Sequence, residues 1–341
     1  MRKKRVSIKD IAADLNISVT TVSFVLNGKA EEKHISKQLT KKVLEYVEKV
    51  NYKPNQVAQS LRTGESKILV FMVEDIANSF FAKLARLIED LAYKKGYKVL
   101  FCSNDNDDNK SMELIHLFKN RQVDGFIIVP SPNIQSTIKN LIEEHIPVLL
   151  FDRYYPDLDT NYVVTNNAEA TQKAIEHLVG NGFENIAYIT LDTQQSQMAD
   201  RLNGYLDTIS KHGLKEISLR LPFSKTISDQ GDKEIKAFLK KHPEIDAILF
   251  ATNYLTETGL EVIKREFPGL IDRIGFITFD DSHLFKTYSP SITAVAQPTA
   301  NMAKQAMDTL LKLIKSDKDI PNKQVVLESS LIVRDSSRKR F

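Results

Sequence analysis

At 341 residues, with 42% hydrophobic and 27% charged side chains, the chain is long enough for two or three globular domains. No run of about 18 apolar residues could span a membrane, and the basic start MRKKR lacks the apolar core of a signal peptide, so we expect a cytoplasmic protein. The net charge of +3 is uneven, because residues 1–62 hold 13 Lys and Arg against 6 Asp and Glu. A basic N-terminal segment on an acidic remainder fits a protein of which only that segment meets phosphates.

Two short helices separated by a brief turn are predicted in residues 7–28. The first opens on a capping box, the second opens on a serine cap, and a third helix with apolar residues every three or four positions follows Ser36. Three short helices with this spacing predict a helix-turn-helix. The capping and terminating residues are Ser7, Asp10, Ser18, Asn27 and Gly28.

The second helix carries hydroxyl and apolar side chains away from its packed stripe. Hydroxyls can bond phosphates or base edges, and apolar side chains can touch thymine methyl groups in a major groove. A small helical bundle without a ligand is the alternative, but it leaves Phe24 unexplained, because Phe24 lies off the packed stripe. The outward residues are Val19, Thr20, Thr21, Ser23 and Phe24.

The segment SIKDIAADLNISVTTVSFVLNGK resembles the helix-turn-helix of the lactose-repressor (LacI/GalR) family of bacterial transcription regulators. The family core VSxxTVSxVLN matches residues 17–27. The resemblance implies that Val19, Thr20 and Phe24 read bases, and Phe24 replaces an arginine of many members, which alters the expected operator at one base pair per half-site. The DNA-contacting residues predicted here are Ser7, Ser18, Val19, Thr20, Thr21, Ser23, Phe24 and Asn27.

The next segment, NYKPNQVAQSLRTG at residues 51–64, predicts a short linker helix after Pro54. From the residues alone, Leu61 fits a domain interface equally well. Similarity to the family pattern YxPNxxAxSLR implies instead a hinge helix that folds on operator DNA in pairs from two chains. Leu61 would then wedge into the minor groove and kink the duplex. The predicted hinge contacts are Tyr52, Asn55, Ala58, Leu61 and Arg62, with Gln59 in place of an arginine of many relatives.

From Lys67 onward, apolar runs alternate with amphipathic helical stretches. KILVFMV, KVLFC, GFIIV and PVLLF form one series, and NIAYIT, DAILFA and IGFITFD form a second. Repeated strand-helix units predict parallel sheets, and two series predict two lobes with a ligand at the carboxyl ends of the strands. The predicted organisation is a helix-turn-helix domain at 1–50, a hinge helix at 51–64 and an effector-binding and dimerisation domain at 65–341. This last domain is expected to be a two-lobed α/β fold similar to periplasmic binding proteins, in which the chain crosses between the lobes near 160, 292 and 322.

Polar side chains beside aromatic rings follow these runs. Such a set suits a sugar, because polar groups bond hydroxyls while a ring stacks on the apolar face of a pyranose. Arg201, in DRLNGY, is expected at the start of a helix. The residues expected around this site from the strand ends are Asp75, Asn78, Ser79, Phe80, Phe81, Asp152, Arg153, Asp192, Asn253, Tyr254, Asp280 and Asp281.

The family resemblance extends over the whole remainder, through DIANSFFAKL, VDGFIIVP, RLNGY and TFDDSHLFKTYSPSITAVAQP. Tyr254 and Thr278 depart from the Asp and Gly of the family pattern and are expected at the cleft, where they would change the ligand. The effector contacts that the resemblance implies are Phe80, Asp152, Arg201, Asn253 and Asp280, with Gln297 in the matched VAQP.

Catalytic signatures are missing from the sequence. It contains no GxGxxG, Walker, HExxH or nucleophile-elbow motif, and its seven histidines do not have metal-ligand spacing. Asp280 and Asp281 are neighbours at a strand end and should point to opposite sides, so a shared acid-base role is not expected. The lone Cys102 fits a small buried side chain. We therefore expect no enzyme activity, no cofactor and no metal.

The interpretation that fits these features is a transcriptional regulator, expected to act as a repressor, whose affinity for operator DNA is set by a sugar or sugar derivative. A homodimer would place two helix-turn-helix units on a pseudo-palindromic operator, and the absence of leucine heptads in IVRDSSRKRF favours a dimer over a tetramer. The alternatives are a transport-type sugar-binding protein and an enzyme on an α/β scaffold. A nucleobase or phosphorylated metabolite as ligand stays open, as does the direction of the response.

Overall fold

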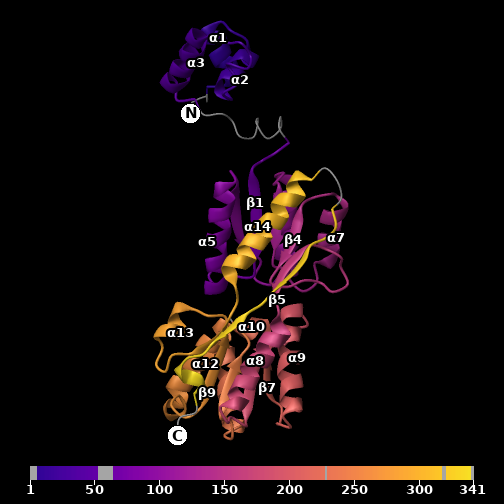
Figure 1. The fold of residues 1–341 in the computed structure, drawn as a ribbon, viewed down its shortest axis with the longest axis vertical. Coiled ribbons are helices and arrows are strands. Elements are labelled where there is room, and N and C mark those ends of the chain that lie inside the picture. Colours follow the sequence, from indigo (N-terminus) through magenta and orange to yellow (C-terminus); the bar gives the residue numbers. More distant parts are fainter. Residues whose placement is uncertain (1–5, 53–63, 227–228, 317–319, 339–341) are drawn as a thin grey trace. The chain divides into compact units, whose positions relative to one another are not determined.

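The computed structural model describes residues 6–52, 64–226, 229–316 and 320–338, and the chain forms two compact units. We call residues 1–66 the head and residues 67–341 the body. In its described part the head consists of helices α1 (Ile8–Leu15), α2 (Val19–Leu26) and α3 (Lys37–Lys49) (Figure 1).

Each helix of the head is capped at its N-terminus by the serine that the sequence predicts. Ser7 and Asp10 form a reciprocal capping box, with the Ser7 backbone N–H donating to the Asp10 carboxylate at 2.8 Å. Ser18 Oγ accepts from the backbone N–H of Thr21 at 3.0 Å. These bonds satisfy backbone donors that the first turn of a helix leaves without partners. The helices pack on a small core of Ile11, Ala12, Val22, Val25 and Val43.

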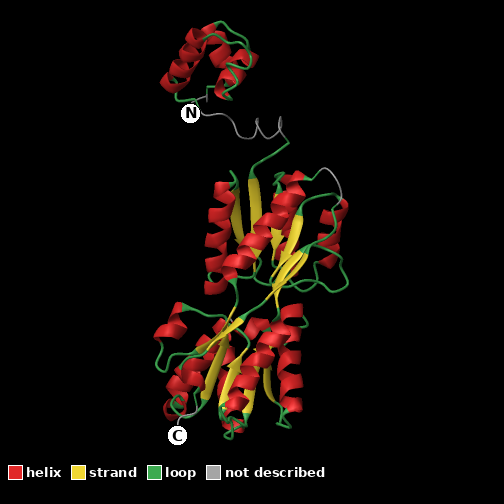
Figure 2. Ribbon diagram, viewed as in Figure 1, coloured by secondary structure: helices red, strands yellow, loops and turns green. Residues whose placement is uncertain are grey.

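The first lobe of the body is a six-stranded, fully parallel sheet of order β11-β5-β4-β3-β1-β2 (Figure 2). Alternate residues of a strand face opposite sides, so the sheet has two cores. Leu69, Phe71 and Val73 pack with α5 and α14, whereas Val70 and Met72 pack with α6 and α7. The elements are β1 (Ile68–Val73), α5 (Ser79–Lys94), β2 (Lys98–Ser103), α6 (Asp108–Asn120), β3 (Gly125–Ile128), α7 (Gln135–Glu143), β4 (Val148–Phe151), β5 (Tyr162–Thr165), α14 (Thr299–Lys315) and β11 (Gln324–Leu327).

The second lobe has a sheet of order β12-β10-β9-β8-β6-β7, in which β12 runs antiparallel to β10 and the other pairs are parallel. The sequence predicts parallel sheets, which the structure confirms, and the antiparallel edge strand β12 was not predicted. The elements are α8 (Asn167–Gly180), β6 (Ile186–Leu191), α9 (Ser196–Lys211), β7 (Ile217–Leu221), α10 (Phe223–Thr226), α11 (Asp229–Lys241), β8 (Ala247–Phe250), α12 (Asn253–Glu266), η1 (Pro268–Leu270), β9 (Gly275–Phe279), α13 (His283–Thr287), β10 (Thr293–Ala296), β12 (Ser330–Ile332) and η2 (Asp335–Ser337).

The chain passes between the lobes after β5, β10 and β11, about five residues later in each case than the sequence indicates. Hydrogen bonds join the three connections. The Asn166 backbone N–H donates to the Leu327 carbonyl at 3.0 Å, and the Ser329 N–H donates to Asn166 Oδ1 at 2.8 Å. Thr165 Oγ1 donates to Gln297 Oε1 at 2.9 Å. The crossings therefore form one connected unit between the two sheets (Figure 1).

All seven apolar runs singled out in the sequence are strands. Five further strands, β5, β7, β10, β11 and β12, were not identified there. The expectation that Arg201 begins a helix is wrong, because α9 begins at Ser196 and Arg201 lies in its second turn.

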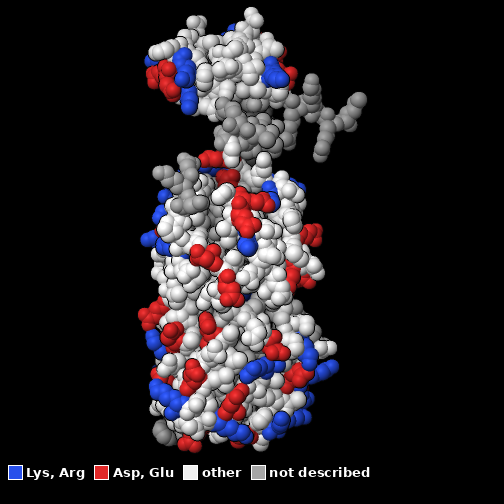
Figure 3. All heavy atoms as spheres, turned by 90° about the vertical axis from the view of Figure 1, so that its right-hand side faces the viewer, with Lys and Arg blue, Asp and Glu red and all other residues white. Residues whose placement is uncertain are grey.

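Acidic and basic side chains intermix over the face of the body drawn in Figure 3. Within the described residues, no helix is both long and apolar enough to cross a membrane. Cys102 is only partly buried, and burial raises the pKa of its thiol to about 11, so this side chain is a neutral thiol at ordinary pH.

Candidate functional sites

Helix α2 presents an exposed face that begins at its first turn. Val19 is 40% exposed, and Thr20 beside it is also exposed. Phe24 is half-buried, and the ammonium of Lys33 lies 5.7 Å from the centre of its ring. An apolar side chain, a hydroxyl and an aromatic ring on one exposed helix can meet thymine methyl groups and polar base edges.

The other polar residues predicted on this surface already have partners within the head. Ser18 caps α2, and its hydroxyl lies 2.8 Å from that of Thr21. Asn27 Nδ2 donates to the Ser23 carbonyl at 2.7 Å. Within the described part of the chain, the Thr20 hydroxyl makes no hydrogen bond. Thr20 is therefore the hydroxyl best placed for a contact outside the protein.

Of the predicted contacts that follow α3, Tyr52 lies within the described residues. Tyr52 is half-buried and packs against the core of the head. Asn55, Ala58, Leu61 and Arg62, together with the predicted hinge helix, lie outside the described residues.

A pocket lies between the lobes at the carboxyl ends of β1, β4, β6, β8 and β9. This is where a ligand is expected in open parallel sheets. The cavity in this pocket has a volume of about 30 Å³. Pockets that bind small molecules have volumes of about 300–1,000 Å³. The structure is thus a closed form with room for a few water molecules. The lining residues are Glu74, Asn78, Phe80, Phe81, Asp152, Arg153, Leu191, Gln197, Met198, Arg201, Thr252, Asn253, Tyr254 and Asp280.

Asp152 and Asp280 occupy corresponding places in the two lobes. Each follows the last residue of a strand, and each has left-handed backbone, with φ of 67° and 73°. Their backbone N–H groups donate to Val163 and Val295 of the next strand, each at 3.0 Å. Aspartate tolerates this conformation better than most residues, although it is sparsely populated. The sharp change of direction brings both carboxyl groups to the pocket.

Two buried arginines lie beside these carboxyl groups and are held by other parts of the chain. Arg201 Nε donates to Asn167 Oδ1 at 2.8 Å, and Arg201 Nη1 donates to the Ala251 carbonyl at 2.7 Å. The Arg201 guanidinium lies 3.5 Å from the centre of the Phe279 ring. Arg153 Nη2 donates to the Glu74 carboxylate at 2.6 Å. Both guanidinium groups are therefore fixed in orientation before any ligand enters.

Direct hydrogen bonds join the two lobes across the cleft. Asn253 Nδ2 donates to Asn78 Oδ1 at 2.8 Å, and Asn78 Nδ2 donates back to Asn253 Oδ1 at 3.2 Å. Gln195 Nε2 donates to Asn106 Oδ1 at 2.9 Å. The backbone N–H of Tyr154 donates to Ser196 Oγ at 3.0 Å. A ligand larger than a few waters enters only when bonds of this kind open.

Burial shifts the pKa of the pocket acids upward. The pKa of Asp152 is raised to about 6 by desolvation, against the opposing effect of Arg153 and Arg201. Desolvation also raises the pKa of Asp280, while Arg201 and a hydrogen bond from Gln297 lower it. Both groups thus ionise less readily than exposed aspartates.

The structure brings most of the predicted effector residues together. Asn78, Phe80, Phe81, Asp152 and Arg153 come from the first lobe, and Arg201, Asn253, Tyr254 and Asp280 from the second.

Several other expected residues lie off the pocket. Asp75 and Asp192 are exposed and do not line it. Gln297 does not line it either, but its side chain donates to Asp280 Oδ1 at 2.7 Å and so holds that carboxylate. Thr278 is buried with its hydroxyl 2.6 Å from that of Thr256, which corrects its expected place at the cleft.

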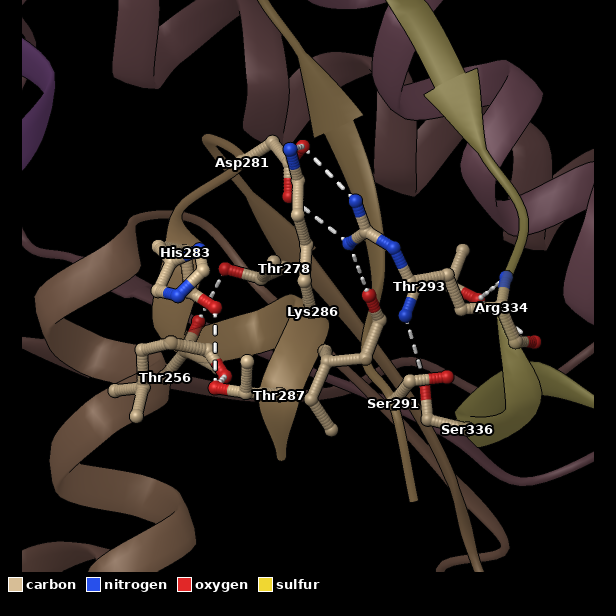
Figure 4. A network of polar contacts seen from close by, with 12 residues as sticks. Thr256, Thr278, Asp281, His283, Lys286, Thr287, Ser291, Thr293, Arg334 and Ser336 are labelled. Atoms are coloured by element: carbon tan, nitrogen blue, oxygen red, sulfur yellow. Dashed lines mark hydrogen bonds and ion pairs between the residues drawn. The ribbon is translucent and has the colours of Figure 1, made fainter. Parts of the chain in front are cut away.

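Asp281 faces away from the pocket, as its position beside Asp280 predicts. Arg334 Nη2 donates to Asp281 Oδ2 at 2.9 Å, and Arg334 Nη1 donates to the Ile292 carbonyl at 2.6 Å (Figure 4). This carboxylate thus holds the C-terminal segment against the loop that follows β9 and does not pair with Asp280.

Five lining residues were not identified from the sequence. Glu74 directly follows β1, a position that could have indicated its role, but Asp75 was predicted in its place. Of the others, one ends β6, one follows β8 and two lie in the first turn of α9, without a distinctive pattern. These five residues are Glu74, Leu191, Gln197, Met198 and Thr252.

Clusters of three or more His, Cys, Asp or Glu that could hold a metal ion are not found within the described ranges. The pocket combines carboxylates, guanidinium groups, amides and the Phe80–Phe81 ring pair, whose centroids are 5.1 Å apart. These groups can bind hydroxyls and cover an apolar ring face.

Comparison with known proteins gives matches for both units. Residues 7–55 match the family described as bacterial regulatory proteins, lacI family. Residues 66–267 match the family described as periplasmic binding proteins and sugar binding domain of LacI family.

Relatives match over nearly the full length. The chain is 30% identical to the HTH-type transcriptional regulator KdgR of Bacillus subtilis, over 98% of this chain and 100% of that protein. It is 28% identical to the ribose operon repressor of Halalkalibacterium halodurans, over 97% of each. A crystal structure of the lac repressor dimer bound to operator and the anti-inducer ONPF superposes with a TM-score of 0.84 and 22% identity, over 98% of this chain and 99% of that chain.

Proposed function

The chain belongs to the lacI family of bacterial regulatory proteins, and on that premise we propose that a small hydroxylated ligand, held between the lobes of the body, controls its affinity for operator DNA. It is a DNA-binding transcriptional regulator with a sugar-binding type of body. The observation that carries the proposal is that one chain contains both a head with an exposed α2 face and a body with a polar pocket.

For the DNA side, we assign base contacts to Val19, Thr20 and Phe24. Their support is exposure on α2 together with the caps that hold this helix. Leu61 is assigned to the minor groove on the family resemblance alone. Ser7, Ser18 and the backbone N–H groups at the helix starts are suited to phosphate oxygens.

For the ligand side, we assign sugar contacts to the lining residues of the pocket. Asp152, Asp280 and Asn253 accept or donate to hydroxyls, Arg153 and Arg201 donate, and the Phe80 ring covers an apolar face. Gln297 acts by positioning Asp280. The name of the ribose operon repressor among the relatives supports a sugar.

At the level of the assembly, we assign a homodimer that binds a pseudo-palindromic operator and represses transcription. The relative named a repressor supports the sign of regulation. Function on operator DNA places the protein in the cytoplasm. The role is binding, not catalysis, as for the regulators that it resembles. A transport-type binding protein is disfavoured, because residues 7–55 match a regulator family.

The isosteric change Thr20→Val tests the DNA side. It removes one exposed hydroxyl and retains the shape of the side chain, so operator affinity should fall about tenfold or more, while the unfolding midpoint stays unchanged. The operator is selected from random duplexes with the purified full chain, and affinity is measured by fluorescence anisotropy.

The matched control is Glu45→Gln on α3, which removes an exposed charge away from α2 and should leave the relative affinities for selected and random duplexes unchanged. Equal operator affinity of Thr20→Val and the unmodified chain would contradict the assignment of α2 as the reading helix.

A further inference from the structure

The charges lining the pocket do not balance. Three carboxylates, Glu74, Asp152 and Asp280, surround the space together with two guanidinium groups, Arg153 and Arg201. All five residues are less than a tenth exposed. Charges in a buried pocket interact far more strongly than charges in water. The net charge of the pocket therefore affects which ligands can bind in it.

Glu74 neutralises the arginine that would otherwise be available to an anion. Its carboxylate accepts from Arg153 Nη2 at 2.6 Å, and the two side chains are 9% and 3% exposed. Arg153 Nη1 donates to Asn106 Oδ1 at 3.2 Å. Both terminal nitrogens of Arg153 are thus engaged by the protein, one by Glu74 and the other by Asn106.

Arg201 is no freer to bind an anion. Its guanidinium stacks on Phe279, and its Nε and Nη1 donate to Asn167 and Ala251. The two pocket carboxyl groups that feel its charge are Asp152 and Asp280. A phosphate or carboxylate at this place would compete with two acids for one cation.

Two buried polar atoms of lining residues have no hydrogen-bond partner in the described structure, and both suit a hydroxyl group. They are Arg153 Nε, a donor, and Gln197 Oε1, an acceptor. Their residues are 2% and 4% exposed. A hydroxyl can accept from the first and donate to the second, whereas a carboxylate or phosphate oxygen would repel the second.

We propose that the ligand of this pocket is an uncharged polyol or sugar, and that Glu74 is the residue that excludes sugar acids and sugar phosphates. This inference rests on the proposed function, because it concerns the ligand that would regulate DNA binding. Glu74 acts by pairing with Arg153, which leaves the pocket with an excess of negative charge.

Matched pairs of ligands test the exclusion directly. The full chain is titrated calorimetrically at pH 7.5 with D-ribose and ribose 5-phosphate, D-glucose with D-glucuronate and glucose 6-phosphate, and D-galactose with D-galacturonate. We expect at least one neutral sugar to bind, and its acid or phosphate to bind at least tenfold more weakly. Tighter or equal binding of a charged form, or binding by no neutral sugar, overturns the proposal.

The variant Glu74→Gln tests the residue. It leaves Arg153 without its counter-charge, so the preference for the neutral sugar over its charged form should shrink at least tenfold. Because a lone buried charge can destabilise the fold, the double variant Glu74→Gln, Arg153→Gln is measured beside it. The double variant keeps the net charge of the pocket, so it should still reject the charged form. An unchanged preference in a folded Glu74→Gln protein, or a lost preference in the double variant, contradicts the role of Glu74.

Asp75→Asn is the matched control, since it removes the adjacent carboxylate, which is exposed and does not line the pocket. Its ligand preference should equal that of the unmodified chain.

Operator binding measured on the same samples separates the two proposals. If a sugar acid changes operator affinity and its neutral form does not, the ligand class is wrong and the regulatory function stands. If a neutral sugar binds without any effect on operator affinity, the regulatory function fails and the ligand class stands.

Discussion

At the scale of single residues, Asp152 shows how a binding group can reduce stability. Its carboxyl group is buried beside the pocket, and desolvation raises its pKa from 3.8 to about 6. The folded chain therefore binds this proton more tightly than the unfolded chain does. Between pH 4 and 6 the contribution of Asp152 to stability falls as the pH rises, and above pH 6 its full cost is present.

We predict that Asp152→Asn stabilises the body at pH 8 by up to about 3 kcal/mol, since each pKa unit corresponds to 1.36 kcal/mol. The gain should vanish towards pH 4, where the native carboxyl is protonated in both states. Asparagine also tolerates the left-handed backbone at this position. Urea unfolding at pH 8 and pH 4.5 measures the difference. A variant less stable than the unmodified chain at pH 8 would show that the arginines outweigh desolvation.

Two acids of the pocket could be found from the sequence because they follow strands that are mostly apolar. Asp152 and Asp280 come directly after such runs, and parallel strands bring their carboxyl ends together. Glu74 occupies the same kind of position, but only the structure shows that it, rather than Asp75, lies in the pocket. Gln197 could not be found, because its place depends on the path of the loop before α9.

At the scale of elements, the contact between α8 and α9 depends on Gly204. A Cβ added to Gly204 would lie 2.3 Å from the carbonyl oxygen of Ala168. Because that atom belongs to the backbone of α8, relief requires movement of a whole helix. The same contact matters for the pocket, since α9 carries Arg201 and α8 carries its partner Asn167.

Gly204→Ala should therefore destabilise the body by about 1–3 kcal/mol, the usual cost of overpacking. Gly180→Ala, in the last turn of α8, is the matched control, because nothing lies within 4 Å of the added Cβ. It should be neutral or stabilising by up to about 1 kcal/mol. Thermal unfolding of both variants gives the comparison. If Gly204→Ala unfolds at the same temperature as Gly180→Ala, the helices do not approach as closely as described.

At this scale, some strands could be predicted from the sequence and others could not, for a physical reason. Six of the seven strands found from apolar runs are largely buried and have 4 to 6 residues each, and the edge strand β2 is the exception. Of the strands that were missed, β11 and β12 have exposed residues along them, and β12 has only 3 residues. Short strands at an edge lack the continuous apolar run that distinguishes central strands.

At the scale of the whole molecule, ligand control requires that the lobes respond to what lies between them. The closed cleft is held by direct bonds such as Asn78–Asn253 and Gln195–Asn106. The pocket acid Asp280 is linked through Gln297 to Thr165 at a crossing between the lobes. A ligand that binds one arrangement of the lobes better than another shifts their populations. The same coupling must act in reverse, from DNA to ligand.

The measurement that tests this account most directly is a titration of full-length protein onto its selected operator, with and without the neutral sugar that binds. We predict that the sugar changes the operator Kd at least tenfold, and that operator DNA changes the sugar Kd by the same factor, as linkage requires. Asp280→Asn, which alters a ligand contact and keeps a side chain that can bond Gln297, should reduce the effect. A sugar that binds in the pocket and leaves the operator Kd unchanged would contradict the account.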